Sequence, residues 1–432
     1  MLSKPVWLWL NEDEGDGLIY WASKFKASCQ AKMSRNLLEF NWSQPLAKSF
    51  RRKSFFLNRQ SLSITGENQL RLVSAPTTGL LNNGFIHGPG SLALNVAVSL
   101  VRQGGGFPGF PSVGSGVENH GVIAAESLTI RATIRGIYSD WTYGVANYGV
   151  INNAKAIYAE DNVDRVGLFN AGIISGFNDL GYKSNIIGKS FGLNQFGTGI
   201  LNLGTINTGG LLQGSGVSGI KNYGLIDFEA SAEGMNRTLG DGFSTGIYNA
   251  GTLRGSRFSE ILRGNGGFSF YGAPTHGIVN EGQIKLAAGN DRIVARGSGR
   301  GSFLPKPPFG FSPDLINAGV IDMGDGNDRI DVSENGIAGS LGKVGSIEMG
   351  AGRDIFFGFG DDQIISGGAG VDTLRLPAGS YEFTPSGFPA SGAMEVSAVG
   401  ASLLFTGFER VGLIGAVGTI PFPVNGGTLT FG

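Results

Sequence analysis

Short segments rich in glycine and aspartate are the part of this 432-residue chain whose residue types could hold a ligand. Each of the five places an aspartate two residues after a glycine. They read AAGNDRI (287–293), GDGNDRI (324–330), GAGRDI (350–355), GFGDDQI (358–364) and GGAGVDTLR (367–375). Glycine lets the backbone turn tightly enough to aim several carbonyl oxygens at one point, and aspartate adds negative charge. The segments therefore predict cation sites built from oxygen atoms.

Calcium is the cation that this donor set favours. It takes roughly six to eight oxygen ligands at about 2.3–2.6 Å, and two loops stacked from successive coils could enclose one ion. The predicted ligand residues are Asp291, Asp328, Gly350, Gly352, Asp354, Gly358, Gly360, Asp362, Gly368, Gly370 and Asp372.

The last segment matches the pattern G-G-x-G-x-D-x-U-x, where U is a large aliphatic residue, at every specified position. Residues 282–410 thereby resemble the RTX, or hemolysin-type, calcium-binding repeat family. The resemblance implies that two nonapeptides make one turn of a β-roll. Asp354 and Asp372, which are 18 residues apart, should then lie directly above one another, with Asp362 on the opposite edge.

Two intervals depart from the RTX spacing. Asp291 and Asp328 are 37 residues apart, and Asp328 and Asp354 are 26 apart. We therefore expect these two loops to lie on coils of a longer parallel β-helix instead of on tandem β-roll turns.

A second repeat, Gly–aliphatic–x–Asn–x–Gly–x–Ile/Leu, predicts the scaffold that positions these loops. In nine copies the residues two before and four after the asparagine are aliphatic, while the residues beside it vary freely. The alternation is typical of a strand with one buried face. Copies 20 to 37 residues apart fit one strand per coil of a parallel β-helix with loops of variable length. The asparagines are Asn82, Asn119, Asn147, Asn170, Asn202, Asn222, Asn249, Asn280 and Asn317.

The inward asparagines have two structural interpretations. Stacked coils would bring their amides into a hydrogen-bonded ladder, because a buried amide without partners is costly. Alternatively, each asparagine could provide a left-handed turn conformation. Either interpretation is favoured over a ligand-binding role.

We therefore expect an all-β protein: a right-handed parallel β-helix, or β-solenoid, that passes into RTX-like β-roll turns and ends in a β-rich cap. The expected parts are a non-repetitive N-terminal segment or cap (1–65), parallel β-helix repeats (66–281), RTX-like calcium-binding repeats (282–376) and a C-terminal cap with a possible type I secretion signal (377–432).

The composition narrows the possible partners. The chain has 74 glycines, 41% hydrophobic residues and a formal net charge of −1, which argues against disorder and against a global basic field for nucleic acid. Its single cysteine excludes disulfides within the chain. The apolar stretch at residues 6–10 is too short for a membrane span or a signal-peptide core.

The C-terminal β-rich segments are similar to the tail of RTX proteins that leave the cell by type I secretion. That resemblance implies export without an N-terminal signal peptide and an extracellular or cell-surface location. Calcium is plentiful there, and its binding energy contributes to folding. The expected partners are calcium ions and a cell-surface glycan or other surface proteins, with no nucleic acid and no membrane span.

Two main functions remain open on sequence alone. The first is a secreted or cell-surface calcium-binding β-solenoid with a structural or adhesive role. The second is a secreted polysaccharide lyase, epimerase or hydrolase on a β-helix. An autotransporter-like adhesin passenger is a third hypothesis. Solvated surface charge is the simpler explanation for the residues that could perform catalysis, which are Glu160, Asp161, Asp164, Arg165 and Lys183.

Overall fold

The computed structural model of the chain consists of β-strands joined by turns, and its described residues contain no helix. The all-β prediction is confirmed. It follows that no helix in this part of the chain has the length and apolarity to cross a membrane. The structure describes residues 18–20, 29–34, 37–42, 54–58, 61–63, 68–74, 78–100, 113–136, 141–161, 166–176, 184–190, 197–236, 244–267, 275–297, 313–339, 343–386, 393–398 and 400–432.

The chain divides into two compact units, Met1–Phe191 and Gly192–Gly432. In the first unit, three long strands from successive coils pair in parallel, and the strand of the middle coil pairs with the strands of the coils before and after it. Ile86, Ile123 and Ile151 lie opposite one another in these strands and are fully buried. The strands are β8 (Phe85–Leu100), β10 (Val122–Gly136) and β12 (Val150–Asp161). A second parallel stack contains β7 (Thr78–Asn82), β9 (Val113–Asn119), β11 (Trp141–Asn147) and β13 (Val166–Asn170).

Parallel pairing in the first unit continues upstream of the first predicted asparagine copy. β4 (Ser54–Asn58) pairs with β7, and this pairing places Asn58 opposite Asn82. β5 (Ser61–Ser63) and β6 (Asn68–Ser74) both pair with β8. Most of the predicted N-terminal segment 1–65 lies outside the described residues. The described part of this segment also contains β1 (Leu18–Tyr20), β2 (Cys29–Ser34) and β3 (Leu37–Trp42).

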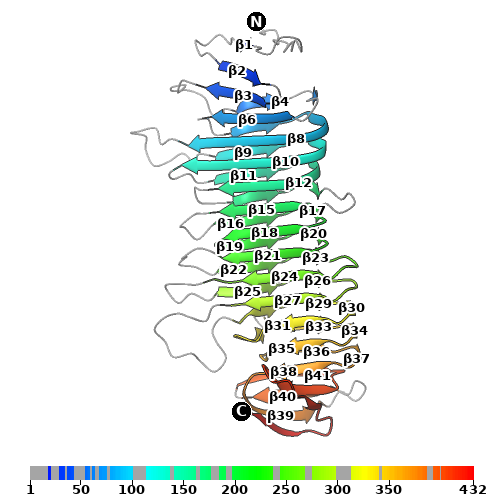
Figure 1. The fold of residues 1–432 in the computed structure, drawn as a ribbon. Helices are drawn as coiled ribbons and strands as arrows, with labels where there is room; N and C mark the ends of the chain where they lie inside the picture. The colour runs from blue at the N-terminus through cyan, green and yellow to red at the C-terminus, as the bar shows by residue number, and fades with distance from the viewer. Residues whose placement is uncertain are drawn as a thin grey trace, which may run out of the picture. The chain divides into compact units, whose positions relative to one another are not determined.

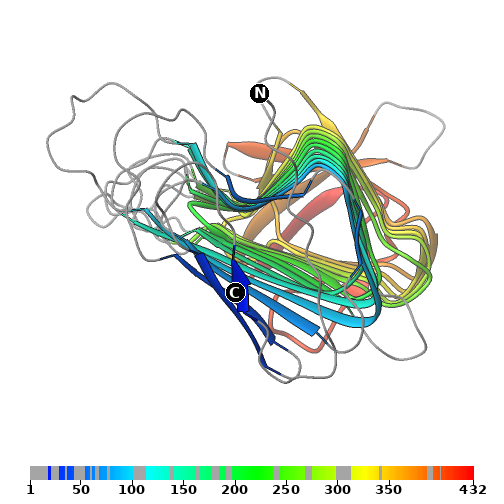
Figure 2. The ribbon, with the colours of Figure 1, turned by 90° about the horizontal axis from the view of Figure 1, so that it is seen from above.

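In the second unit, the repeating coils contribute strands to three parallel stacks, and the strands of each stack lie over one another when seen from above (Figures 1 and 2). The first stack is β16 (Thr198–Asn202), β19 (Ser218–Asn222), β22 (Ser244–Asn249), β25 (Thr275–Asn280), β28 (Leu315–Asn317) and β32 (Ile337–Ala338). The second is β17 (Thr205–Thr208), β20 (Leu225–Phe228), β23 (Thr252–Arg254), β26 (Gln283–Lys285), β29 (Val320–Asp322), β33 (Gly345–Glu348), β36 (Gln363–Ser366) and β41 (Ala401–Thr406). The third is β18 (Leu211–Gly216), β21 (Ser231–Asn236), β24 (Ile261–Asn265), β27 (Arg292–Arg296), β31 (Arg329–Asp331), β35 (Ile355–Phe357), β38 (Thr373–Leu376) and β42 (Arg410–Leu413). The parallel β-helix prediction is confirmed.

The asparagines form the predicted amide ladder at the turn between the first and second stacks. In the first unit Asn82 donates to Asn119, Asn119 to Asn147 and Asn147 to Asn170, at 2.7–2.8 Å. In the second unit the chain of donation runs through five asparagines at 2.8–2.9 Å, namely Asn202, Asn222, Asn249, Asn280 and Asn317. The described asparagines of the ladder are fully buried, so each amide replaces hydration with a neighbour's amide.

The amide ladder ends in a glutamine. Asn317 donates to Gln363 Oε1 at 3.0 Å, and Gln363 Nε2 donates back to the Asn317 carbonyl at 2.8 Å. Gln363 belongs to the GFGDDQI segment, and the same coil forms the bridge between Gly360 and Ile337 of the first stack. This segment therefore occupies the asparagine corner of its coil.

An antiparallel cap follows the last coil of the second unit. β39 (Gly379–Pro385) pairs antiparallel with both β40 (Met394–Ala398) and β44 (Gly427–Phe431). Phe405 of β41 joins cap to coil, because its ring lies 6.1 Å from that of Phe356 and 5.5 Å from that of Phe408. Covering the final coil in this way protects its strand edges from pairing with other chains.

Candidate metal centre

The acidic turns connect the second and third stacks of the second unit. At this corner three two-residue strands pair in parallel, so that Gly326, Gly352 and Gly370 lie opposite one another (Figure 1). The strands are β30 (Asp325–Gly326), β34 (Ala351–Gly352) and β37 (Ala369–Gly370). Turns that were 26 and 18 residues apart in the sequence are thus brought into direct register.

Glycine is required at these turns by backbone geometry and by crowding. Gly350 and Gly368 have φ angles of 98° and 94°, which residues with a side chain rarely adopt. A Cβ atom on Gly350 would lie 1.6 Å from the Gly324 carbonyl oxygen, and one on Gly368 would lie 1.8 Å from the Gly350 oxygen. The backbones of successive turns therefore approach more closely than any other residue would allow.

Six acidic residues, which we call the acidic column, follow one another along this corner. Their carboxylates link successive coils, since each acid after the first accepts a hydrogen bond from the backbone N–H of the acid one coil earlier. Asp291 Oδ1 accepts from Glu260 at 2.7 Å, and Asp328 and Asp354 Oδ1 accept from Asp291 and Asp328 at 2.7 Å. Asp372 Oδ1 then accepts from Asp354 at 2.9 Å, and Glu409 Oε2 accepts from Asp372 at 2.7 Å.

Among the described residues, the second carboxylate oxygens of every acid of the column except Glu409 have no hydrogen-bond partner. Asp291, Asp328, Asp354 and Asp372 are at most 1% exposed, and their Oδ2 atoms make no hydrogen bond, as is also true of Glu260 Oε2. Buried polar atoms in native proteins are nearly always paired, because leaving one unpaired costs about 1–3 kcal/mol and more for a charged group. A repeated row of such atoms is the arrangement that a bound cation would complete.

Burial makes these carboxyl groups hard to ionise without a cation. It is the largest cause that raises the pKa of Asp291 and Asp328 to about 7 and that of Asp354 and Asp372 to about 6. Neighbouring acids of the column act in the same direction on Asp291, Asp328 and Asp372, because adjacent negative charges repel. The backbone hydrogen bonds described above act against the rise and do not cancel it.

The donor set of the column fits a hard cation. The residues of this corner offer carboxylate oxygens and the backbone carbonyl oxygens of the glycine turns, with no imidazole or thiolate. The Gly350 carbonyl already accepts the N–H of Ala369 at 2.8 Å, but a carbonyl oxygen has a second lone pair. Among the described residues no group of three or more His, Cys, Asp or Glu side chains is arranged to hold a metal ion. A cation at the column would therefore draw most of its ligands from backbone carbonyls and water.

The fourth predicted segment does not join the column. Asp362 is exposed, has a φ angle of 56° and lies in the coil corner that carries the amide ladder, next to Gln363. Gly358 follows β35 at the end of the third stack, where its N–H donates to the Arg375 carbonyl, and Gly360 bridges to Ile337 of the first stack. Asp362, which was expected on the edge opposite Asp354 and Asp372, therefore lies away from the column, as do Gly358 and Gly360; calcium binding by these three residues stays a prediction.

The two ends of the column, Glu260 and Glu409, were not predicted from the sequence. Glu260 lies in GSRFSEIL, which lacks the glycine spacing, and Glu409 follows Asp372 by 37 residues. A usable signal was the buried apolar residue two positions after each acid. Leu262 and Val411 lie in the same strand stack as Ile293, Ile330, Phe356 and Leu374, and all six are fully buried.

The predicted catalytic residues do not form a site in the described part of the chain. Asp161 is fully buried at the end of β12, where its Oδ2 accepts hydrogen bonds from Thr142 Oγ1 at 2.6 Å and from Val166 N–H at 3.2 Å. Glu160 is half-buried in the same strand. Asp164, Arg165 and Lys183 lie outside the described residues. The Asp161 carboxylate therefore stabilises its own coil.

Comparison of the chain with protein-family models, with curated proteins and with solved structures finds no match.

Proposed function

We propose that the chain is a calcium-binding β-solenoid with a structural or adhesive role outside the cell, in which calcium stabilises the C-terminal coils. The observation that carries the proposal is the row of buried Oδ2 atoms without partners in Asp291, Asp328, Asp354 and Asp372. The resemblance of residues 282–410 to RTX repeats supports the same ligand. Calcium would supply positive charge and would bind the oxygen atoms at this corner, where the backbones of successive coils already meet.

Charge explains why binding would be coupled to folding. Each coil from residue 260 to residue 409 adds one carboxyl group to the acidic column, and these groups are forced into a row only in the folded state. A ligand that binds the folded chain and not the unfolded chain stabilises it by mass action. Folding would then be favoured in a calcium-rich extracellular medium, which supports an extracellular or cell-surface location.

A regular stack serves a structural or adhesive protein more directly than an enzyme. The described coils repeat the same strands along the stack, and the Asp161 carboxylate accepts hydrogen bonds within its own coil. Repeat proteins of this kind use their long lateral surfaces to bind partners.

Thermal unfolding during a calcium titration tests the proposal. The melting temperature of the wild-type chain should rise with calcium, whereas Asp354→Asn should reduce that rise because an amide nitrogen replaces the unpaired oxygen. Asp322→Asn is the matched control, since Asp322 lies on β29 of a neighbouring coil, outside the column, and the substitution removes the same charge. Calcium-independent unfolding of the wild-type chain, or equal effects of the two substitutions, would contradict the proposal.

A further inference from the structure

Four arginines gather on the outward side of the third stack, and we call them the arginine cluster: Arg263 of β24, Arg292 and Arg296 of β27, and Arg329 of β31. Arg292 and Arg329 lie directly opposite each other in adjacent coils. Their neighbours Ile293 and Ile330 are fully buried, so the arginine side chains alternate to the solvent side. The cluster is therefore part of an outer strand surface.

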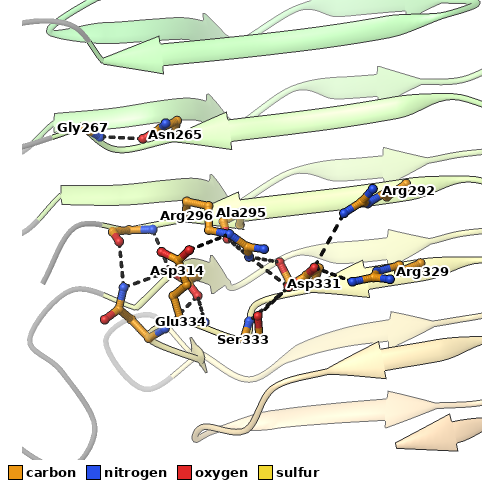
Figure 3. A network of polar contacts seen from close by, with 12 residues as sticks. Asn265, Gly267, Arg292, Ala295, Arg296, Asp314, Arg329, Asp331, Ser333 and Glu334 are labelled. Carbon is orange, nitrogen blue, oxygen red and sulfur yellow. Dashed lines mark hydrogen bonds and ion pairs between the residues drawn. The ribbon is translucent and has the colours of Figure 1, made fainter. Parts of the chain in front are cut away.

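One carboxylate lies at the centre of the cluster. Asp331 accepts hydrogen bonds from Arg296 at 2.9 Å and from Arg329 at 2.8 Å, and Arg292 approaches it at 3.8 Å (Figure 3). Burial alone would raise the pKa of Asp331, but these guanidinium groups and Ser333 outweigh burial and hold the pKa below its usual value. The cluster thus already binds carboxylates of the chain itself, since Arg296 Nε also pairs with Glu334 Oε1 at 3.1 Å.

Two of the arginines keep their hydrogen-bonding capacity. Among the described residues, Arg292 and Arg263 have no hydrogen-bond partner, and each forms one longer ion pair, at 3.8 Å to Asp331 and at 3.7 Å to Glu233. Their side chains are 42% and 47% exposed. Arg292 and Arg329 lie opposite each other on adjacent coils, so their positive charges repel each other. A further anion would relieve this repulsion and use the free donors.

We propose that the arginine cluster binds the carboxylate groups of an acidic polysaccharide. Guanidinium groups recognise planar carboxylates through paired hydrogen bonds, as Arg254 does with Asp227 within the chain, at 2.7 Å for each bond. Arginines on adjacent coils are separated by about the 4.8 Å strand spacing, so a chain that repeats its carboxylates can bind several at once. The inference names the glycan partner's chemistry and rests on the extracellular role proposed above.

The surface around the cluster favours a polysaccharide over a protein or a nucleic acid. Protein interfaces generally have an apolar centre, whereas Ile261 is the one exposed large hydrophobic side chain on the described strands β24, β27 and β31. Nucleic-acid binding depends on many phosphate contacts, and this chain has a net charge of −1.

Binding of hyaluronate, a carboxylate polysaccharide, to the full chain tests the inference. Arg263→Gln combined with Arg292→Gln should weaken binding at least about tenfold, since it removes the donors that are free in the structure. Arg254→Gln combined with Lys285→Gln is the control, because these residues are opposite each other on β23 and β26 and carry the same total charge. The control should change the affinity less than about twofold. Unchanged melting temperatures in both double variants establish that the coils remain folded.

The probes separate the possible ligands. Hyaluronate should bind more tightly than free glucuronate, neutral dextran or a DNA duplex. Equal binding of glucuronate would show that the cluster is a small-anion site, and tighter binding of DNA would show that a nucleic acid is the ligand. Either result overturns the inference. Equal losses of hyaluronate affinity in the two double variants would also overturn it. If calcium does not change unfolding but hyaluronate binding still depends on Arg263 and Arg292, the calcium proposal fails and this inference stands.

Discussion

Individual carboxylates of the acidic column combine two roles that are usually separate. One oxygen of Asp328 joins adjacent coils by accepting the Asp291 N–H at 2.7 Å, while the other is buried without a partner. The first role is structural and is complete without a ligand. The second leaves a cost that only protonation or a cation removes.

Replacing one of these carboxylates should have opposite effects with and without calcium. In EDTA at pH 8, Asp328→Asn should melt about 2–4 °C above the wild-type chain, which corresponds to about 1 kcal/mol for a unit of this size, because it removes one buried negative charge. In saturating calcium the same variant should melt below the wild-type chain, because a ligand oxygen is lost. Differential scanning calorimetry in both buffers measures the reversal. A variant that is less stable in both would show that Asp328 is purely structural.

The raised pKa values predict an inverted pH dependence for the calcium-free chain. An unfolded aspartate ionises near pH 4, but in the folded state the pKa of Asp291 and Asp328 is about 7. Between these values the folded state binds more protons than the unfolded state, so the free energy of unfolding should fall as the pH rises from about 4 to 7. Chemical denaturation in EDTA across this range measures the slope, and a rising free energy would contradict it. Calcium should remove most of the loss, since the metal binds the ionised form.

Sequence spacing identified the central aspartates of the column but not its ends. The segments at Asp328, Asp354 and Asp372 have recognisable glycines, because a tight turn that approaches the turn below needs them. Glu260 lies in a looser turn whose Ser256 donates to its Oε1 at 2.6 Å, so the glycine signal is absent. Register across coils, which depends on intervening loop lengths, is what reveals Glu260 and Glu409.

Among the structural elements, the glycine turns depend most strictly on residue type. Gly350→Ala would place a Cβ atom 1.6 Å from the Gly324 carbonyl oxygen and would force a φ of 98° on alanine. We expect a loss of more than about 3 kcal/mol in the free energy of unfolding. Ala351→Ser is a suitable control, because Ala351 is the next residue and is exposed. Similar denaturation midpoints for both variants would show that the turns do not need this close approach.

The strand stacks were largely predictable, and their exceptions have physical causes. The alternation around Asn222 gave the buried positions Ile220 and Ile226 directly, because a strand with one buried face repeats every two residues. The copy at Asn58 was missed, since Gln60 stands where the other copies have glycine. GFGDDQI was predicted to bind calcium on the edge opposite Asp354 and Asp372, and its role in the amide ladder was missed, because Gln363 stands where the other copies have asparagine.

For the whole molecule, nearest-neighbour stacking predicts that calcium acts locally. Each coil is stabilised mainly by the coils next to it, so a ligand of the acidic column should protect only those coils and their immediate neighbours. Hydrogen exchange with and without calcium should show added protection in residues 254–411 and little change in residues 85–161. Uniform protection of both ranges would contradict a local effect.

Crystals grown with calcium offer the most direct observation of the acidic column. Anomalous difference density should show ions about 2.3–2.6 Å from the Oδ2 atoms of Asp328, Asp354 and Asp372, at the edge formed by the glycine turns. Density that shows these oxygens bonded only to water or to protein, with no ion beside them at saturating calcium, would contradict the proposal that the column binds calcium.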